Sequence, residues 1–244
     1  MPLSERPLES ALFGCGVYAV TADSLPALRC ALEAARSLSG ALVIVRIPVD
    51  SVEAIHAVEA AGGRLCDILV TLGGPLASTL QTRVAEVTVR RAQAADADAL
   101  STMATRSFRA ATTHWHSDPR LPTARADELY GRWAAALAQG ATNEAPLFIA
   151  ETREHSIAGF LSLALEADDT WHVPLTGVAP ECRGRGVLSA MLDAAAITCG
   201  RPAVPQTLHY ETQLTNIAAL RAVSRRGLVV RSSRLTFHLW VPEA

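Results

Sequence analysis

The chain has 244 residues, about half of them apolar, which is enough to bury a core in one large domain or two small ones. Its formal net charge is −2, and its 22 basic residues, all arginine, are scattered along the chain, so it carries no electrostatic footprint for nucleic-acid binding. The absence of lysine excludes Schiff-base chemistry on a protein lysine. The five cysteines form no C-x-x-C pair, which argues against a disulfide framework and against a zinc site.

The sequence also predicts a protein without a membrane partner. Its first thirty residues include Glu5 and Glu9 and have no continuous apolar core. No later stretch reaches the roughly 18 consecutive apolar residues of a membrane span. We therefore expect a cytoplasmic location.

Strand and helix patterns alternate over residues 17–72. Strands are expected over 18–21, 41–47 and 65–71, and helices over 24–37 and 51–61. Asp50 and Ser51 are cap candidates for the second helix, and Gly62 ends it because glycine tolerates positive φ. The Gly73-Gly74-Pro75 run stops the last strand, so a junction is predicted near residue 80. The predicted organisation is a small α/β domain over residues 1–80 and a second domain over 86–244.

The second domain is predicted to contain strands and helices in mixed order. A strand over 85–92 precedes helices over 96–108 and 124–138, and a hairpin with its turn at 152–155 joins strands 147–151 and 156–165. An extended segment over 171–178 leads to a helix that ends near Cys199. A strand over 208–212, a helix over 216–226 and two closing strands that end at Trp240 complete the chain.

A glycine-arginine loop, Arg183-Gly-Arg-Gly186, connects the extended segment to an apolar helix. Glycine leaves no side chain between the backbone and an anion, so N–H groups at the helix start can converge on phosphate oxygens. Arg183 and Arg185 add positive charge. Neither the Walker pattern nor the dinucleotide fingerprint is present, so the pyrophosphate that fits here belongs to another cofactor.

This loop and the later segment Asn216-Ile-Ala-Ala-Leu-Arg-Ala-Val-Ser-Arg-Arg-Gly227-Leu resemble two motifs of the GNAT superfamily of N-acetyltransferases. The family loop reads R/Q-x-x-G-x-G/A, and the family helix reads N-x-x-A-L-x-x-Y-x-x-x-G-F. The resemblance covers residues 86–240 and implies an α/β (α+β) fold. In it, helices flank a mixed central sheet whose fourth and fifth strands splay apart around acetyl-CoA. Leu188 departs from the usual Gly or Ala, and Val223 replaces the family tyrosine.

The resemblance also implies which residues bind the cosubstrate acetyl-CoA. They come from the fourth strand, from the loop with the first turn of the next helix, and from the asparagine of the second motif. These residues are Thr176, Gly177, Val178, Arg183, Gly184, Arg185, Gly186, Val187, Leu188, Ser189 and Asn216.

The family reaction needs a base for the ammonium proton and an acid for the departing thiolate. His172 is the candidate base, because a histidine near the start of the fourth strand can line the acceptor funnel with a suitable pKa. A structural strand histidine is the alternative. Tyr210 or Ser224 could replace the missing tyrosine as the acid, and solvent is a further donor. Tyr210 and Glu211 alternate along their strand, so only one of them faces the cleft.

The loop between the first two helices of the family fold forms the acceptor side, and here it contains the expected substrate residues Arg109, His114, Trp115 and His116. Two histidines without a third ligand do not make a metal site, so no metal is expected.

The wider pattern includes Leu8-Glu-Ser-x-Leu-Phe13-Gly14, Asp118-Pro119, Asp127-x-Leu-Tyr130-x-x-Trp133 and the segment 233–240. It resembles bacterial dTDP-fucosamine acetyltransferases, which implies dTDP-4-amino-4,6-dideoxygalactose as the acceptor. Another small-molecule amine, a protein N-terminus and a non-catalytic acyl-CoA-binding role are the alternatives. A homodimer is compatible with the sequence.

Overall fold

The computed structural model describes residues 3–76, 86–109, 111, 113–166, 169–199 and 206–243. The N-terminal third alternates short strands and helices. Its elements are β1 (Ser4–Glu5), α1 (Pro7–Phe13), β2 (Val17–Thr21), α2 (Leu25–Ala35), β3 (Leu42–Pro48), α3 (Val52–Ala60) and β4 (Arg64–Pro75). Ser24 caps α2, because its hydroxyl accepts from the backbone N–H of Ala27 at 3.4 Å.

The rest of the chain contains the elements expected of a mixed sheet with flanking helices. They are β5 (Val87–Arg91), η1 (Ala94–Asp96), α4 (Ala97–Phe108), α5 (His114–Ser117), α6 (Thr123–Gln139), β6 (Leu147–Thr152), β7 (Ile157–Ser162), β8 (Ala164–Leu165), β9 (Thr170–Val173), β10 (Thr176–Val178), η3 (Pro180–Cys182), α7 (Val187–Cys199), β11 (Thr207–Gln213), α8 (Ile217–Ser224) and β12 (Val229–Trp240).

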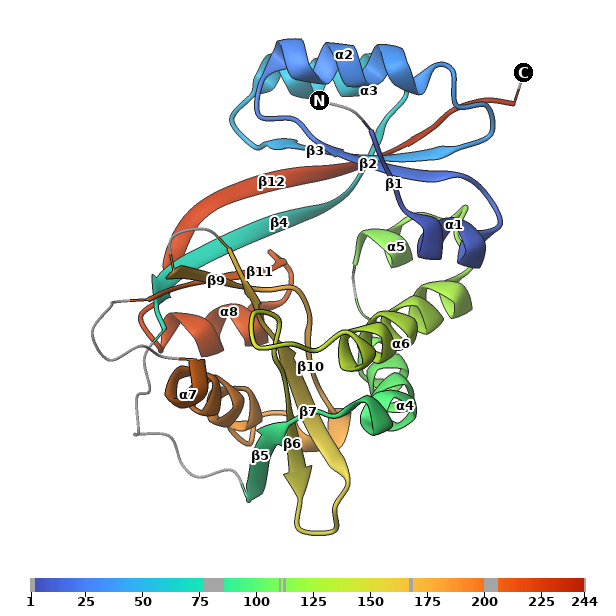
Figure 1. Cartoon of the computed structure of the whole chain (residues 1–244). Helices are drawn as coiled ribbons and strands as arrows, with labels where there is room; N and C mark the ends of the chain where they lie inside the picture. The colour runs from blue at the N-terminus through green and yellow to red at the C-terminus, as the bar shows by residue number, and fades with distance from the viewer. Residues whose placement is uncertain are drawn as a thin grey trace.

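The strands form two sheets, and the larger one joins both ends of the chain. Its order is β1-β2-β3-β12-β4-β11-β9-β8, and the smaller sheet has the order β10-β7-β6-β5. β2 and β3 are parallel, but the C-terminal strand β12 lies between β3 and β4 and pairs antiparallel with both. In Figure 1 the long red and teal strands β12 and β4 run side by side from the N-terminal layer toward α7 and α8.

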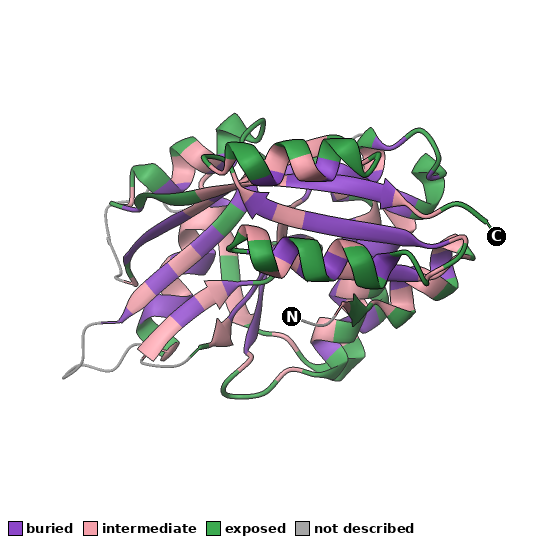
Figure 2. Cartoon of the chain, turned by 90° about the horizontal axis from the view of Figure 1, so that it is seen from above, coloured by how far each residue is buried: buried purple, intermediate pink, exposed green. Residues whose placement is uncertain are grey.

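Alternating side chains of the larger sheet supply separate hydrophobic clusters. Val43 and Val45 of β3 pack with α2 and α3, whereas Leu42 and Ile44 pack with residues of α1, α5 and α6. The helices therefore lie on opposite sides of this part of the sheet (Figure 1). A third cluster joins α4, α6 and α7 to the smaller sheet. Figure 2 shows the same layering, with largely buried strands beneath helices whose outer faces are exposed.

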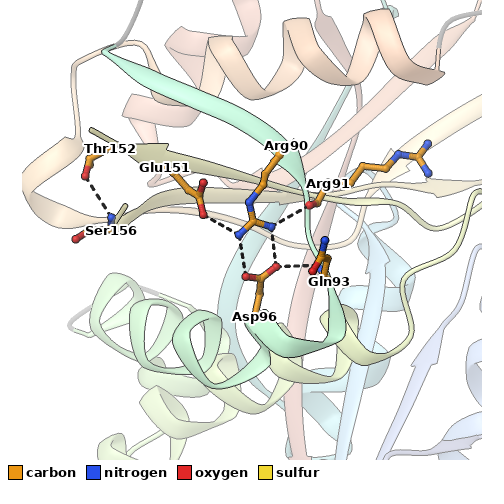
Figure 3. Close-up of polar contacts among 7 residues, drawn as sticks. All are labelled: Arg90, Arg91, Gln93, Asp96, Glu151, Thr152 and Ser156. Carbon is orange, nitrogen blue, oxygen red and sulfur yellow. Dashed lines mark hydrogen bonds and ion pairs between the residues drawn. The ribbon is translucent and has the colours of Figure 1, made fainter. Parts of the chain in front are cut away.

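An ion-pair cluster connects the first strand of the smaller sheet to the helical layer (Figure 3). The Arg90 guanidinium donates to both carboxylate oxygens of Asp96 at 2.9 Å and to Glu151 Oε1 at 2.7 Å. Asp96 Oδ2 also accepts from the backbone N–H of Gln93 at 2.7 Å, which caps η1. The hydrogen bonds from Arg90 lower the pKa of Asp96. This cluster fixes where α4 begins relative to β5 and β6.

The predicted mixed sheet with flanking helices is confirmed, and most predicted elements lie within a few residues of the observed ones. The two closing strands were wrong, because residues 229–240 form the single strand β12, with bulges where its register shifts. The predicted strand over 156–165 is divided between β7 and β8, which belong to different sheets. α1 was not predicted. The expected junction near residue 80 lies outside the described residues.

Within the described ranges, the structure contains no helix that is both long and apolar enough to cross a membrane.

Candidate functional site

The strand segment over residues 170–178 breaks in the middle, and this break opens the sheet. β9 stays paired in parallel with β11, with Val173 and Tyr210 as the last pair, whereas β10 pairs with β7 in the smaller sheet. Pro174 at the break has no backbone N–H to donate to a neighbour. Ser162 Oγ donates to the Leu175 carbonyl at 2.7 Å and accepts from the Leu175 N–H at 2.9 Å. β10 and β11 therefore form the two arms of a fork.

The β10 arm presents backbone groups to the fork. Leu175 and Ala179 bond their backbone groups to β7. Because alternate residues of a strand direct these groups to opposite sides, the N–H and C=O groups of Thr176 and Val178 point away from β7. Gly177 lies where a Cβ would come within 2.8 Å of a ring carbon of Phe160. This glycine lets β10 lie close against the core.

The loop after β10 has the backbone shape of an anion cradle. Gly184 and Gly186 have positive φ angles of 74° and 82°, a region that favours glycine. α7 starts directly afterwards at Val187 and has 13 residues. The first N–H groups of a helix have no partner within it, and the helix dipole makes this end positive. The loop and helix start can therefore hold a phosphate group.

The two arginines of the loop have different environments. Arg183 donates from Nη2 to the Ser107 carbonyl at 2.6 Å and from Nε to the Val178 carbonyl at 3.3 Å. It thus connects the end of α4 to β10 and fixes the cradle. The Arg185 side chain is exposed beside the cradle.

The first turn of α7 is held by the core and by α8. Val187 is 2% exposed, and Leu188 packs against the main hydrophobic cluster. The bulk of Leu188, where the family usually has Gly or Ala, is therefore accommodated by packing. The Ser189 carbonyl accepts from Arg226 Nη1 at 3.4 Å, and Arg226 also contacts Asp193 Oδ1 at 2.8 Å.

The second motif forms α8. Asn216 is its N-cap: Oδ1 accepts from the Ala219 N–H at 3.3 Å, and Nδ2 donates to Thr212 Oγ1 at 3.0 Å. Val223, at the position of the family tyrosine, is fully buried in the main cluster. The asparagine side chain thus holds the start of α8 against the end of β11.

The candidate base His172 lies beside a carboxylate. Its Nδ1 is 3.3 Å from Glu166 Oε1, and Nδ1 of His209 is 3.6 Å from Glu166 Oε2. His172 and His209 are register partners on β9 and β11, so they share one face of the sheet.

Tyr210 and Glu211 lie on opposite faces of β11. Tyr210 is 2% exposed within the main cluster, and burial raises its pKa. Glu211 is exposed, and its Oε1 accepts from Thr71 Oγ1 at 2.9 Å. It is the first residue of β11 beyond the last pair with β9. Glu211 therefore lies where the fork opens, on the same face as His209.

Of the four expected substrate residues, only Arg109 is exposed. Trp115 is 1% exposed, and its ring lies 5.2 Å from that of Phe13. His116 contacts Thr113 Oγ1 at 2.7 Å through Nδ1 and Asp127 Oδ1 at 3.2 Å through Nε2. His114 is 5% exposed. The side chains of Trp115 and His116 therefore pack α5 against its neighbours.

His114 belongs to a chain of hydrogen bonds that sequence reasoning missed. Asp118 Oδ2 lies 2.8 Å from His238 Nδ1, and His238 Nε2 lies 2.8 Å from His114 Nδ1. His114 Nε2 lies 3.5 Å from Arg46 Nη2. Because a guanidinium can only donate and a carboxylate only accepts, we assign the ring protons to His114 Nδ1 and His238 Nδ1. The chain orients Arg46 through the two imidazole rings.

The electrostatics of this chain follow from burial. Burial first, and then the positive charge of Arg46, lower the pKa of His114 well below its ordinary value. Burial alone would raise the pKa of Asp118, but hydrogen bonds from His238 and Trp240 lower it. The only sequence sign of this site was Arg46, a charged residue within an apolar strand.

Cys66, Asp118 and His238 place one ligand atom each within 4.8 Å of one another. Both ring nitrogens of His238 and Oδ2 of Asp118 are already engaged in hydrogen bonds. Burial raises the pKa of Cys66 to about 12, which disfavours the thiolate that a metal requires. The expectation that the protein has no metal stays a prediction.

The divided sheet, the fork and the glycine cradle define a GNAT acetyltransferase fold. The model of the "Acetyltransferase (GNAT) family" matches residues 107–228, half of the chain, and the chain belongs to this family. No curated protein matches this chain.

Solved structures share this fold at low sequence identity. A functionally unknown conserved protein from Staphylococcus epidermidis has a TM-score of 0.65 at 11% identity, covering 93% of this chain and 84% of its own. A GCN5-related N-acetyltransferase from Sphaerobacter thermophilus has a TM-score of 0.55 at 17% identity, and the match covers 84% of this chain and 62% of that protein. One from Kribbella flavida has a TM-score of 0.54 at 12% identity, covering 91% and 80%.

The buried neutral state of His114 predicts acid sensitivity. Because its pKa is lower in the folded chain than in the unfolded chain, its contribution to stability is complete above about pH 6.5 and is lost as the pH falls below that value, by up to about 1.4 kcal/mol per pH unit. Urea unfolding between pH 7.5 and 5 should show this slope. His114→Gln should flatten it, and His56→Gln, at an exposed site on α3, should retain it. An unchanged slope in His114→Gln would contradict the assignment.

Proposed function

We propose that this protein is an N-acetyltransferase that takes the acetyl group from acetyl-CoA and transfers it directly to an amine. The observation that carries the proposal is the fork between β10 and β11, which leads to a glycine cradle at the start of α7. The residues proposed to hold acetyl-CoA are those expected from the sequence, over residues 176–178 and 183–189 together with Asn216.

The fit of this cosubstrate rests on backbone groups. The backbone N–H and C=O groups of Thr176 and the N–H of Val178 point into the fork, where they can bind the amide groups of a pantetheine arm. The N–H groups of residues 186–188 can bind the pyrophosphate. A Cβ at Gly184 would meet no atom within 4 Å, so the space beside this part of the loop is open. Bound acetyl-CoA supplies an activated thioester.

The chain contributes polarisation and proton transfer. Backbone N–H groups at the fork can stabilise negative charge on the carbonyl oxygen. His172 and Glu211 share one face near the fork, and either can accept the ammonium proton. Tyr210, the acid expected from the sequence, is buried on the face of β11 opposite Glu211, so solvent is proposed to protonate the departing thiolate.

A nucleotide-linked amino sugar similar to dTDP-4-amino-4,6-dideoxygalactose is the proposed acceptor, on the basis of the sequence resemblance. Exposed Arg109 could contact its diphosphate, while His114, Trp115 and His116 shape the wall behind it. Another small-molecule amine or a protein N-terminus, and non-catalytic acyl-CoA binding, are the competing functions.

Replacing Gly186 by valine should raise the Kd for acetyl-CoA at least about tenfold, because the side chain would separate the cradle N–H groups from phosphate and would strain the positive φ. Isothermal titration calorimetry measures this change. Gly62→Val is the matched control, since Gly62 has φ 88° at the end of α3. It should destabilise the fold similarly and leave the Kd unchanged. A folded Gly186→Val protein with wild-type affinity would remove the cofactor assignment.

Thiol release distinguishes the candidate functions. Wild-type protein with acetyl-CoA is assayed for free thiol against dTDP-linked amino sugars, polyamines, aminoglycosides and a peptide N-terminus. Release only with the sugar nucleotides supports the proposed acceptor, and release with another class replaces it. Tight acetyl-CoA binding without release from any amine would indicate the non-catalytic role.

The base is tested by comparing His172→Ala with Glu211→Gln. The variant that lacks the base should lose about 10²-fold or more in kcat at neutral pH, and its rate should rise with pH as more acceptor amine becomes neutral. The other variant should keep the wild-type pH profile. If His172→Ala retains that profile, His172 is a structural histidine paired with Glu166.

A further inference from the structure

Three polar residues lie in a row across the middle of the larger sheet. Thr236 of β12 is the register partner of Arg46 on β3 and of Asp67 on β4. Directly paired residues project from the same face of a sheet. This face also carries Ile44, which packs with α1, α5 and α6, so the row faces these three helices.

Each residue of the row has a buried polar atom without a hydrogen-bond partner within the described chain. These atoms are Arg46 Nε, Asp67 Oδ1 and Thr236 Oγ1. A buried polar atom without a partner destabilises the fold, so three adjacent ones are not expected in a site that serves packing alone. Although Arg46 and Asp67 have opposite charges, no nitrogen of Arg46 lies within 4.0 Å of a carboxylate oxygen of Asp67 in this part of the structure. The two charged groups are therefore not paired directly with each other.

His114 holds both charged residues in place. Its ring Nε2 accepts from Arg46 Nη2 at 3.5 Å, and its backbone N–H donates to Asp67 Oδ2 at 3.1 Å. The ring is in turn held by His238 and Asp118. This support orients one side of each charged group and leaves Arg46 Nε and Asp67 Oδ1 without partners, as expected of a site prepared for a ligand.

Asp67, at one end of the row, borders a hollow. A cavity of about 240 Å³ is lined by Leu65, Cys66, Asp67, Ile68, Leu214 and Thr215. Leu214 and Thr215 follow β11 and directly precede Asn216. Glu211, at the opening of the fork, is close enough to act on the Arg46 charge. An acceptor bound at Asp67 would therefore lie next to the end of β11, which is one arm of the fork.

We propose that Arg46, Thr236 and Asp67 form the acceptor subsite and that it selects an acceptor carrying an anionic group, a carboxylate or a phosphate. This inference rests on the proposed acetyltransferase function. Arg46 binds the anionic group, Thr236 donates a further hydrogen bond, and Asp67 accepts from an ammonium or hydroxyl group of the same molecule. His114 is a positioning residue for Arg46. The subsite combines strands from both ends of the chain.

The test uses acceptor pairs that differ in one anionic group. Phenylalanine is compared with its amide for a carboxylate, and phosphoethanolamine with ethanolamine for a phosphate. Thiol release with saturating acetyl-CoA gives kcat/KM for each. Wild-type protein should prefer the anionic member of at least one pair by roughly tenfold or more. The pair that shows the preference identifies the anionic group. Equal kcat/KM values within both pairs, or a preference for the uncharged members, would overturn the proposal.

Variants assign the preference to the row. Arg46→Gln should reduce the ratio within the preferred pair to near one, and Arg46→Lys should give an intermediate ratio, since it keeps the charge but not the forked donors. Asp67→Asn should raise KM and keep the preference. Arg125→Gln, at an exposed α6 residue paired with Glu128, is the control and should match wild type. An unchanged ratio in folded Arg46→Gln protein would mean that the row holds only ordered water.

Binding separates failure of this subsite from failure of the proposed function. Calorimetric titration of the same acceptors into protein saturated with CoA measures the anion preference without turnover. If no amine releases thiol but the anionic member still binds more tightly in wild-type protein than in Arg46→Gln, the transferase function fails and the subsite stands. If thiol is released without any such preference, the subsite fails and the transferase function stands. Should Arg46→Gln not fold, the comparison of wild type with Arg46→Lys decides.

Discussion

The insertion of β12 between β3 and β4 is the interaction on which the arrangement of this protein depends. Its 12 residues pair with β3 along one edge and with β4 along the other. β4 in turn pairs with β11, the second arm of the fork. The N-terminal strands thereby become part of the sheet that contains the site, and the ends of the chain lie in one layer (Figure 1).

The break between β9 and β10 opens the fork at the edge of this sheet. A proline removes one backbone donor, and the Ser162 hydroxyl accepts from the Leu175 N–H, which would otherwise remain unpaired. Each arm of the fork is then held by a different partner, β10 by β7 and β11 by β4. Opening is thus built into the strand pairing, and backbone groups can be offered to a cosubstrate without loss of the core beneath them.

Charge is buried in this protein where side chains hold it in place. Asp118 receives hydrogen bonds from His238, Trp240 and the backbone of Arg120, and the chain continues through His114 to Arg46. Such an arrangement contributes little net stability by comparison with apolar packing, but removing one member leaves another charge without compensation. The chain is therefore better understood as a support for Arg46 than as a source of stability.

The sequence by itself determined the local features. Glycines at 184 and 186 and the apolar helix after them predicted the cradle, and the order of motifs predicted the GNAT fold, because backbone conformation and helix starts depend on residues near in sequence. Residue alternation also indicated that only one of Tyr210 and Glu211 faces the cleft. Only the tertiary structure decided that Glu211 is exposed and Tyr210 buried, that residues 229–240 form one strand, and that His114 and Trp115 are buried. It alone brought Arg46, Asp67 and Thr236 together. These outcomes depend on pairing between strands distant in sequence, which no local pattern of residues specifies.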